Sequence, residues 1–185
     1  MKIYIDQGHN PVNPNAGAEG NGLREQDLTY KIGVLLAEYL NEAGIETRLS
    51  RPTPTTQLGT SNSTSLAARV NDANSWGADY FVSLHANASS ITTASGSEGY
   101  VYALGSTAAR LSQSILDGLS ATTGLPDRGT FARPTLYVLR RTRMPAVLVE
   151  MGFITNPDDA YLMNNRPDLF ARGIADGILA FVRRR

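Results

Sequence analysis

The stretch KIYIDQGH, residues 2–9, opens the chain with a short apolar run, Lys2–Asp6, that ends just before His9. A second run of this kind, Tyr80–Leu84, directly precedes His85, and these are the only two histidines. Short apolar runs are typical of buried strands, and α/β proteins place functional side chains where strands open into polar loops. We therefore expect both imidazoles at one edge of a sheet, as two of the three ligands of a catalytic zinc site.

Strand and helix patterns alternate along the rest of the chain, after a polar loop at Gln7–Arg24 whose length suggests function. The predicted strands are Lys2–Asp6, Ile45–Ser50, Tyr80–Leu84, Glu98–Leu104, Leu136–Leu139 and Pro145–Glu150. The predicted helices are Leu28–Leu40, Ser65–Trp76, Ser106–Thr122, Pro157–Met163 and Asp168–Arg183. This alternation predicts the α/β class, with a twisted, mostly parallel sheet of about six strands and helices on both faces.

The composition narrows the possible chemistry. A length of 185 residues fits one domain. The chain has no cysteine, so a metal ion must be held by histidine, carboxylate or water. Seventeen acidic residues balance seventeen basic ones, which argues against a nucleic-acid or polybasic membrane partner. No membrane span or signal-peptide pattern is visible, and a monomer is expected.

The third ligand of such a site must be an acidic residue. Glu25 is the best candidate, because it stands at the start of the first predicted helix, directly after the loop that leaves His9. A carboxylate there is also favoured by the helix dipole, which offers a purely structural explanation. Glu19, in the middle of the loop, and Glu98, at the start of a predicted strand, are the competing candidates.

A metal-activated water also needs a proton acceptor. Glu150 ends the apolar run Pro145–Val149, where a buried carboxylate is costly unless it is paired, bound to metal or catalytic. We therefore assign Glu150 as the candidate general base. The structural alternative is an ion pair with one of five arginines that are otherwise expected to be solvated or salt-bridged: Arg128, Arg133, Arg140, Arg141 and Arg143.

Several motifs occur in the order and spacing of a known family. They are Asp6–His9, Arg24–Leu28, Leu49–Arg51, Arg69–Asn74, Ser83–Ala88, Gly96–Gly99 and Pro145–Asn156. The chain resembles the zinc-dependent N-acetylmuramoyl-L-alanine amidases, which include sporulation and division amidases and the catalytic domains of phage endolysins. The most specific motifs are Ser83–Ala88 and Val147–Asn156. The resemblance runs nearly end to end, which implies that residues 1–185 form a single amidase catalytic domain.

The resemblance also implies roles for individual residues. His9, Glu25 and His85 match the three Zn²⁺ ligands of the family, and Glu150 matches its catalytic glutamate. The implied reaction is hydrolysis of the amide between N-acetylmuramic acid and L-alanine in peptidoglycan. Metal-activated water would attack the carbonyl, and Glu150 would pass its proton to the leaving nitrogen. Action is then expected at the bacterial cell wall, in an extracellular or periplasmic location.

Two features of the site stay open at this level. The family commonly has Gly-Gly after the first histidine, whereas this chain has Asn10 and Pro11, which is expected to alter the loop beside the metal. A basic residue such as Arg128 or Arg133 is expected to assist the reaction or hold the peptide, and the sequence does not choose between them.

The sequence is also compatible with two other function classes. One is a zinc peptidase that cuts within the stem peptide, which would need the same metal and the same base. The other is a non-catalytic module that binds peptidoglycan, which would not require Glu150. Analysis of the reaction products separates all three.

Overall fold

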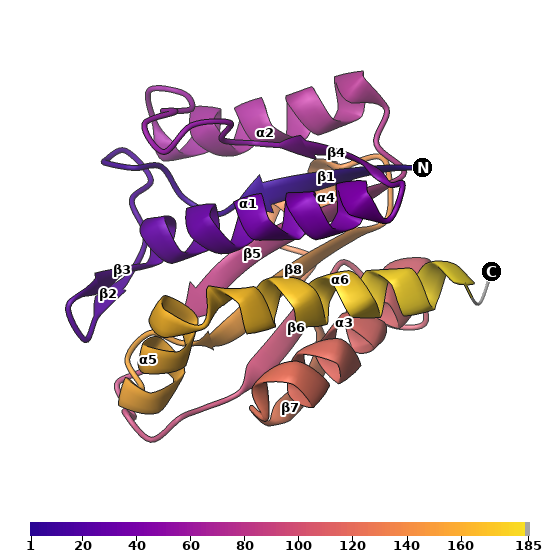
Figure 1. The fold of residues 1–185 in the computed structure, drawn as a ribbon. Coiled ribbons are helices and arrows are strands. Elements are labelled where there is room, and N and C mark those ends of the chain that lie inside the picture. Colours follow the sequence, from indigo (N-terminus) through magenta and orange to yellow (C-terminus); the bar gives the residue numbers. More distant parts are fainter. Residues whose placement is uncertain (184–185) are drawn as a thin grey trace.

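A six-stranded sheet forms the centre of the molecule in the computed structural model, which describes residues 1–183 (Figure 1). Its strands are β1 (Lys2–Gln7), β4 (Glu46–Leu49), β5 (Tyr80–Asn87), β6 (Ser97–Val101), β7 (Asp127–Ala132) and β8 (Ala146–Phe153). They lie in the order β4-β1-β5-β8-β6-β7, and every neighbouring pair is parallel except β6 and β8. The predicted α/β class with a mostly parallel sheet is therefore confirmed.

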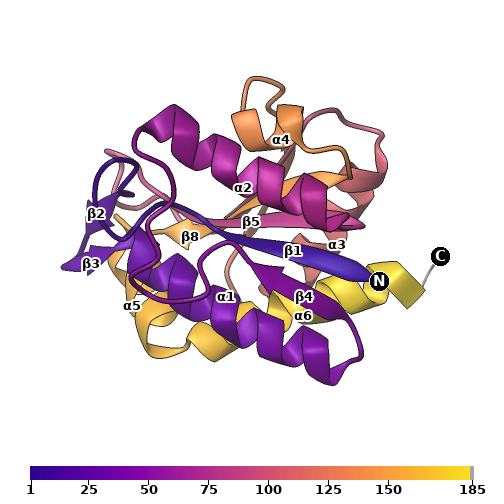
Figure 2. The same cartoon turned by 90° about the horizontal axis from the view of Figure 1, so that it is seen from above.

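Helices cover both faces of this sheet, as predicted (Figure 2). One layer contains α1 (Glu25–Glu42), α3 (Thr107–Thr123) and α6 (Pro167–Arg183), and the larger hydrophobic core lies beneath it. The other layer contains α2 (Asn62–Trp76) and α4 (Tyr137–Arg141) over a smaller core. The remaining helix, α5 (Pro157–Asn165), follows the end of β8.

Helices α3 and α6 pack closely because glycines line their crossing. A Cβ atom at Gly118 of α3 would lie 2.2 Å from the carbonyl oxygen of Gly173 on α6. At Gly177 of α6, a Cβ atom would meet the Ser114 carbonyl oxygen at 2.3 Å. Both contacts are with backbone atoms, so a larger residue would have to push the helices apart.

The predicted strand at Leu136–Leu139 is wrong, because most of this run belongs to α4. A short apolar run does not distinguish a strand from a helical turn by periodicity, and here Val138 and Leu139 are buried under the second helical layer. The sixth strand is instead β7, which the sequence did not predict. This edge strand is polar and partly exposed, so it lacks the alternation of a half-buried strand.

Some predicted boundaries also differ from the structure. A two-stranded hairpin of β2 (Glu19–Gly20) and β3 (Leu23–Arg24) interrupts the predicted loop. Helix α1 begins at Glu25, directly after this hairpin, and β6 ends at Val101 rather than Leu104. In Figure 1 the hairpin lies at the end of the molecule toward which the arrows of β1 and β5 point.

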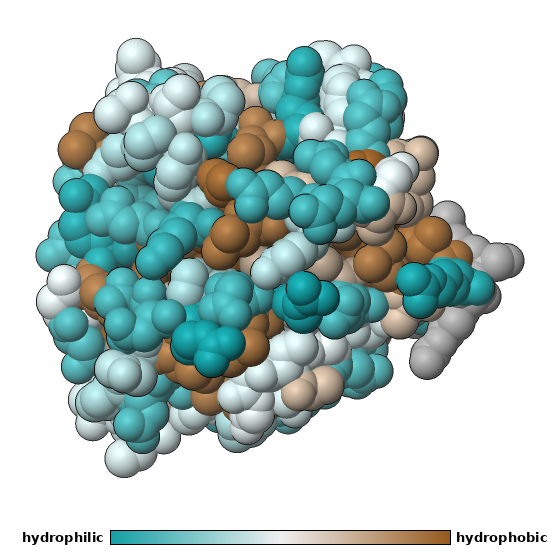
Figure 3. All heavy atoms as spheres, viewed as in Figure 1, coloured by the Kyte–Doolittle hydropathy of each residue, from teal (hydrophilic) through white to brown (hydrophobic). Residues whose placement is uncertain are grey.

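The surface over α1 and α6 is mainly hydrophilic, with hydrophobic side chains visible between the two helices (Figure 3). Partly buried residues of these helices pack against the larger core, among them Leu35, Tyr39, Leu179 and Val182. Within residues 1–183, no helix combines the length and apolar character needed to cross a bilayer.

Candidate metal centre

His9 enters the site from the loop that follows β1. Its backbone φ is 69°, in the left-handed region that costs a non-glycine residue about 1–2 kcal/mol. Gly8 passes so close to β5 that a Cβ atom there would lie 2.6 Å from Cε1 of His85. Its amide donates to the Leu84 carbonyl at 3.0 Å. The loop therefore needs glycine at position 8 to bring the two histidines together.

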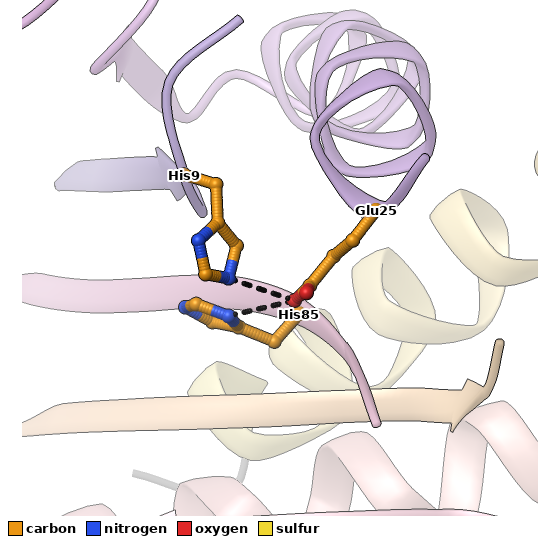
Figure 4. Close-up of side chains that lie close together, drawn as sticks. All are labelled: His9, Glu25 and His85. Atoms are coloured by element: carbon orange, nitrogen blue, oxygen red, sulfur yellow. Dashed lines mark hydrogen bonds and ion pairs between the residues drawn. The ribbon is translucent and has the colours of Figure 1, made fainter. Parts of the chain in front are cut away.

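Glu25 is the first residue of α1 and lies between the two imidazoles (Figure 4). Its Oε1 atom is 3.1 Å from Nε2 of His9 and 3.0 Å from Nδ1 of His85. The amides of Ala86 and Ala18 donate to its two carboxylate oxygens at 3.0 and 2.9 Å. Four partners from three segments of the chain thus hold this carboxylate in one position.

The electrostatics favour an ionised Glu25. Burial by itself raises the pKa of the carboxyl, but the hydrogen bonds and charges of His85 and His9 outweigh burial and hold this pKa well below its usual range. The carboxylate side chain is 5% exposed, whereas the two imidazoles are 18–20% exposed. The site is therefore a charged, buried carboxylate flanked by two accessible nitrogen donors.

These three side chains fit a zinc ion. One donor atom from each lies within 4.8 Å of the other two. Two imidazoles and one carboxylate are a ligand set found in catalytic zinc sites, where the fourth position is left for water or substrate. Among residues 1–183, no other group of three or more such side chains was found with a comparable arrangement.

The two competing carboxylates lie outside this group. Glu19 is exposed on β2, where its backbone pairs with that of Arg24. Glu98 is buried on β6, and its carboxylate accepts hydrogen bonds from Arg128 Nε at 2.6 Å and from the Tyr100 hydroxyl at 2.6 Å. Neither carboxylate therefore approaches the histidines in the way that Glu25 does.

Glu150 lies beside the metal centre on β8, directly opposite His85 on β5. Its Oε2 atom is shielded from solvent and has no hydrogen-bond partner among residues 1–183. Burial, followed by the negative charges of Glu25 and Glu98, raises the pKa of Glu150 to about 8. A shielded carboxylate oxygen without a partner is unfavourable for stability and typical of a functional group.

The predicted alternative, an ion pair between Glu150 and an arginine, is not found within residues 1–183. Arg128 instead pairs with Glu98. Arg133 lies over the rings of Tyr100 and Phe131. The other three arginines lie near the beginning of β8, in or just after α4, and are exposed: Arg140, Arg141 and Arg143.

Beneath the metal centre, a buried network holds the loop of His9. Arg69 of α2 donates from Nη1 to Asp6 Oδ1 at 2.6 Å and from Nη2 to the His9 carbonyl at 2.5 Å. The Ser83 hydroxyl donates to the other Asp6 oxygen at 2.7 Å. Sequence reasoning did not identify this network, although an aspartate that ends an apolar strand was a usable signal.

A small cavity of about 130 Å³ opens beside the two histidines. Its apolar side is formed by residues of α2, α4 and β8 and the residue before α4: Leu66, Leu136, Tyr137, Val138 and Leu148. Sites for drug-sized ligands are typically roughly 300–1,000 Å³. This cavity therefore suits a small apolar group next to the metal centre rather than a whole saccharide.

Nearly the whole chain is similar to proteins of one known family. A family model described as "N-acetylmuramoyl-L-alanine amidase" matches residues 3–180. The chain is 37% identical over 186 residues to the N-acetylmuramoyl-L-alanine amidase CwlM of Bacillus licheniformis, covering 96% of this chain and 67% of that protein. It is also 37% identical over 185 residues to the amidase LytC of Bacillus subtilis, covering 98% of this chain and 35% of that protein. The chain thus spans about two thirds of one relative and about one third of the other.

The fold also has solved relatives. The N-acetylmuramoyl-L-alanine amidase AmiC2 of Nostoc punctiforme superimposes with a TM-score of 0.87 at 30% sequence identity. That match covers 100% of this chain and 98% of the other.

Proposed function

The chain belongs to the N-acetylmuramoyl-L-alanine amidases, a family of hydrolases, and we propose that it hydrolyses the amide between N-acetylmuramic acid and L-alanine in peptidoglycan. The observation that carries this proposal is the convergence of His9, Glu25 and His85 beside an unpaired Glu150. Relatives named as amidases support the substrate class, and they support action at the cell wall.

His9, Glu25 and His85 are the proposed ligands of a zinc ion. When bound, zinc supplies Lewis-acid chemistry, by which water is activated and an amide carbonyl is polarised. Glu25 contributes a negative charge whose position is held by the amides of Ala18 and Ala86. His9 and His85 contribute nitrogen donors that stay partly accessible, so substrate can approach from their exposed side.

Glu150 is the proposed general base. Its carboxylate stands next to His85 across the β5–β8 pair and has an oxygen free of hydrogen bonds within residues 1–183. It would accept a proton from the attacking water and return it to the alanine nitrogen as the amide breaks. Its position next to His85, with a free oxygen, suits this exchange, because the same group must both take up and give up a proton.

The test is mass spectrometry of purified peptidoglycan after incubation with zinc-loaded protein, chelated protein and Glu150→Gln. We expect stem peptides with a free amino-terminal L-alanine only from the zinc-loaded wild type. Glu19→Gln makes the same chemical change at an exposed carboxylate outside the site and should leave cleavage intact. Cuts within the stem peptide would indicate a peptidase, and binding without cleavage at any zinc level would indicate a non-catalytic module.

A further inference from the structure

The register of the sheet aligns three side chains in one row, and an ion pair adds a fourth from the edge strand. His85 on β5 is paired with Glu150 on β8, which in turn is paired with Glu98 on β6. The carboxylate of Glu98 then binds Arg128 of β7. Paired residues on neighbouring strands point to the same face of a sheet. The row thus runs from a proposed metal ligand, through the proposed base, to a positive charge at the edge of the sheet.

The contacts of Arg128 hold its guanidinium in place and leave one of its nitrogen donors without a partner within residues 1–183. Its Nε atom donates to Glu98 at 2.6 Å and its Nη1 atom to the Ser95 carbonyl at 3.3 Å. The guanidinium also lies 5.1 Å from the centre of the Phe153 ring. Within residues 1–183, its other terminal nitrogen, Nη2, has no hydrogen-bond partner, and the side chain is 41% exposed. A fixed guanidinium with a free donor is well suited to bind a carboxylate.

The spacing matches a peptide that starts at the metal centre. Neighbouring strands lie about 4.8 Å apart, so the backbone of β7 is roughly 10 Å from that of β8. Each residue of an extended peptide spans at most about 3.6 Å. When the amide before L-alanine lies at Glu150, the carboxyl group of the next residue can therefore reach the free nitrogen of Arg128.

We propose that Arg128 binds the carboxylate of the second stem-peptide residue and makes the protein selective for stems in which that residue is acidic. This inference rests on the proposed amidase function. Without Arg128, the carboxylate of Glu98 would have no ion-pair partner within residues 1–183 and would repel an approaching carboxylate. The guanidinium neutralises the charge of Glu98, and its Nη2 atom, which has no hydrogen-bond partner within residues 1–183, can donate to the substrate carboxylate.

Arg133 is the main competitor, and its environment differs. Its guanidinium lies 5.1 Å from the ring centre of Tyr100 and 5.8 Å from that of Phe131. Tyr100 lies opposite Leu148, two positions along β8 from Glu150. Arg133 therefore lies farther along the sheet from the base, and no ion pair within residues 1–183 fixes its direction.

The test compares two synthetic muramoyl peptides that differ at one group. Both carry L-alanine followed by a glutamate whose α-carboxyl is either free or amidated. For zinc-loaded wild type, we expect kcat/KM to be about tenfold higher for the free acid. For Arg128→Met, the ratio should fall to about one while the amidated peptide is still cleaved. Arg128→Lys should restore part of the preference for the free acid, because lysine returns the positive charge without the planar set of N–H donors of a guanidinium.

The ratio of the two kcat/KM values distinguishes loss of carboxylate recognition from a general loss of activity, because both substrates use the same metal and base. Arg133→Met is the matched control and should keep the wild-type preference. An unchanged ratio in Arg128→Met, or a ratio lost in Arg133→Met instead, would overturn the inference. A wild type that cleaves neither peptide would instead count against the amidase function itself.

Discussion

The pair formed by Asp6 and Arg69 allows a quantitative prediction. Their side chains are 2% and 1% exposed, and the Asp6 Oδ1 and Arg69 Nη1 atoms are 2.6 Å apart. Removing one partner of a buried pair leaves an uncompensated charge, which typically costs about 3–5 kcal/mol. We therefore expect Arg69→Met to lower the free energy of unfolding of the metal-free protein by this amount. Since domains are stable by only about 5–15 kcal/mol, the variant should fold but be marginal.

The same substitution should weaken zinc binding. Arg69 donates to the His9 carbonyl and so helps to hold His9 in its left-handed conformation. Loss of such an indirect support typically lowers metal affinity about 10–100-fold. Urea denaturation measures the stability, and competition with a chromophoric chelator measures zinc affinity under conditions where the variant is folded. A folded variant with wild-type zinc affinity would refute the positioning role.

The control is an exposed pair of the same chemistry. Arg48 and Asp72 also form an ion pair, at 2.9 Å, but their side chains are 44% and 45% exposed. Exposed pairs typically contribute about 0–1 kcal/mol, so Arg48→Met should cost no more than about 1 kcal/mol and should leave zinc affinity unchanged. An equal cost at both pairs would show that burial does not determine the effect.

The loss caused by Arg69→Met should depend on pH in a defined direction. Burial tends to raise the pKa of Asp6, but the charge of Arg69 and the Ser83 hydroxyl hold this pKa below its ordinary value of 3.8. A lowered carboxyl pKa stabilises the folded state above the unfolded value, and this contribution disappears as pH falls through the folded value. The difference between wild type and variant should thus be largest near neutral pH and shrink in acid. A difference that grows on acidification would contradict this assignment.

Three further outcomes are expected. Glu25→Ala should abolish stoichiometric zinc binding in a chelator titration, since it removes one ligand and the partner of both imidazoles; binding at wild-type affinity would exclude Glu25 as a ligand. In metal-free protein, the raised pKa of Glu150 should make stability fall as pH rises from about 4.5 to about 8, and denaturation at both pH values should show a smaller fall in Glu150→Gln. Gly118→Ala should lower the midpoint of thermal unfolding, with a cost of about 1–3 kcal/mol, because the new methyl group meets the Gly173 backbone; an unchanged midpoint would mean that the helices separate freely.

Several features of this protein were determined by local sequence alone. Apolar runs flanked by polar loops identified β1, β5 and β8, because buried strands need continuous apolar side chains. The same runs placed His9, His85 and Glu150 toward the carboxyl ends of three neighbouring parallel strands, although β5 and β8 continue past His85 and Glu150. The family motifs lie along these same elements, and the family resemblance is confirmed.

Other features depended on which elements meet in space. The sequence favoured Glu25 over Glu19 and Glu98 only through its place at a predicted helix start and through the family resemblance. The packing of α1 beside β1 and β5 is what brings Glu25 between the histidines. Likewise, the partner of Arg128 follows from the placement of β7 next to β6.

The physical reason is the range of the interactions. Strand and helix periodicity reflects burial of neighbouring residues along the chain, so it can be read from a short window. The edge strand β7 and the short helix α4 bury too few side chains to produce such a pattern. Ion pairs such as Asp6 with Arg69 join residues 63 positions apart, and only the order of strands and helices in the folded protein decides them.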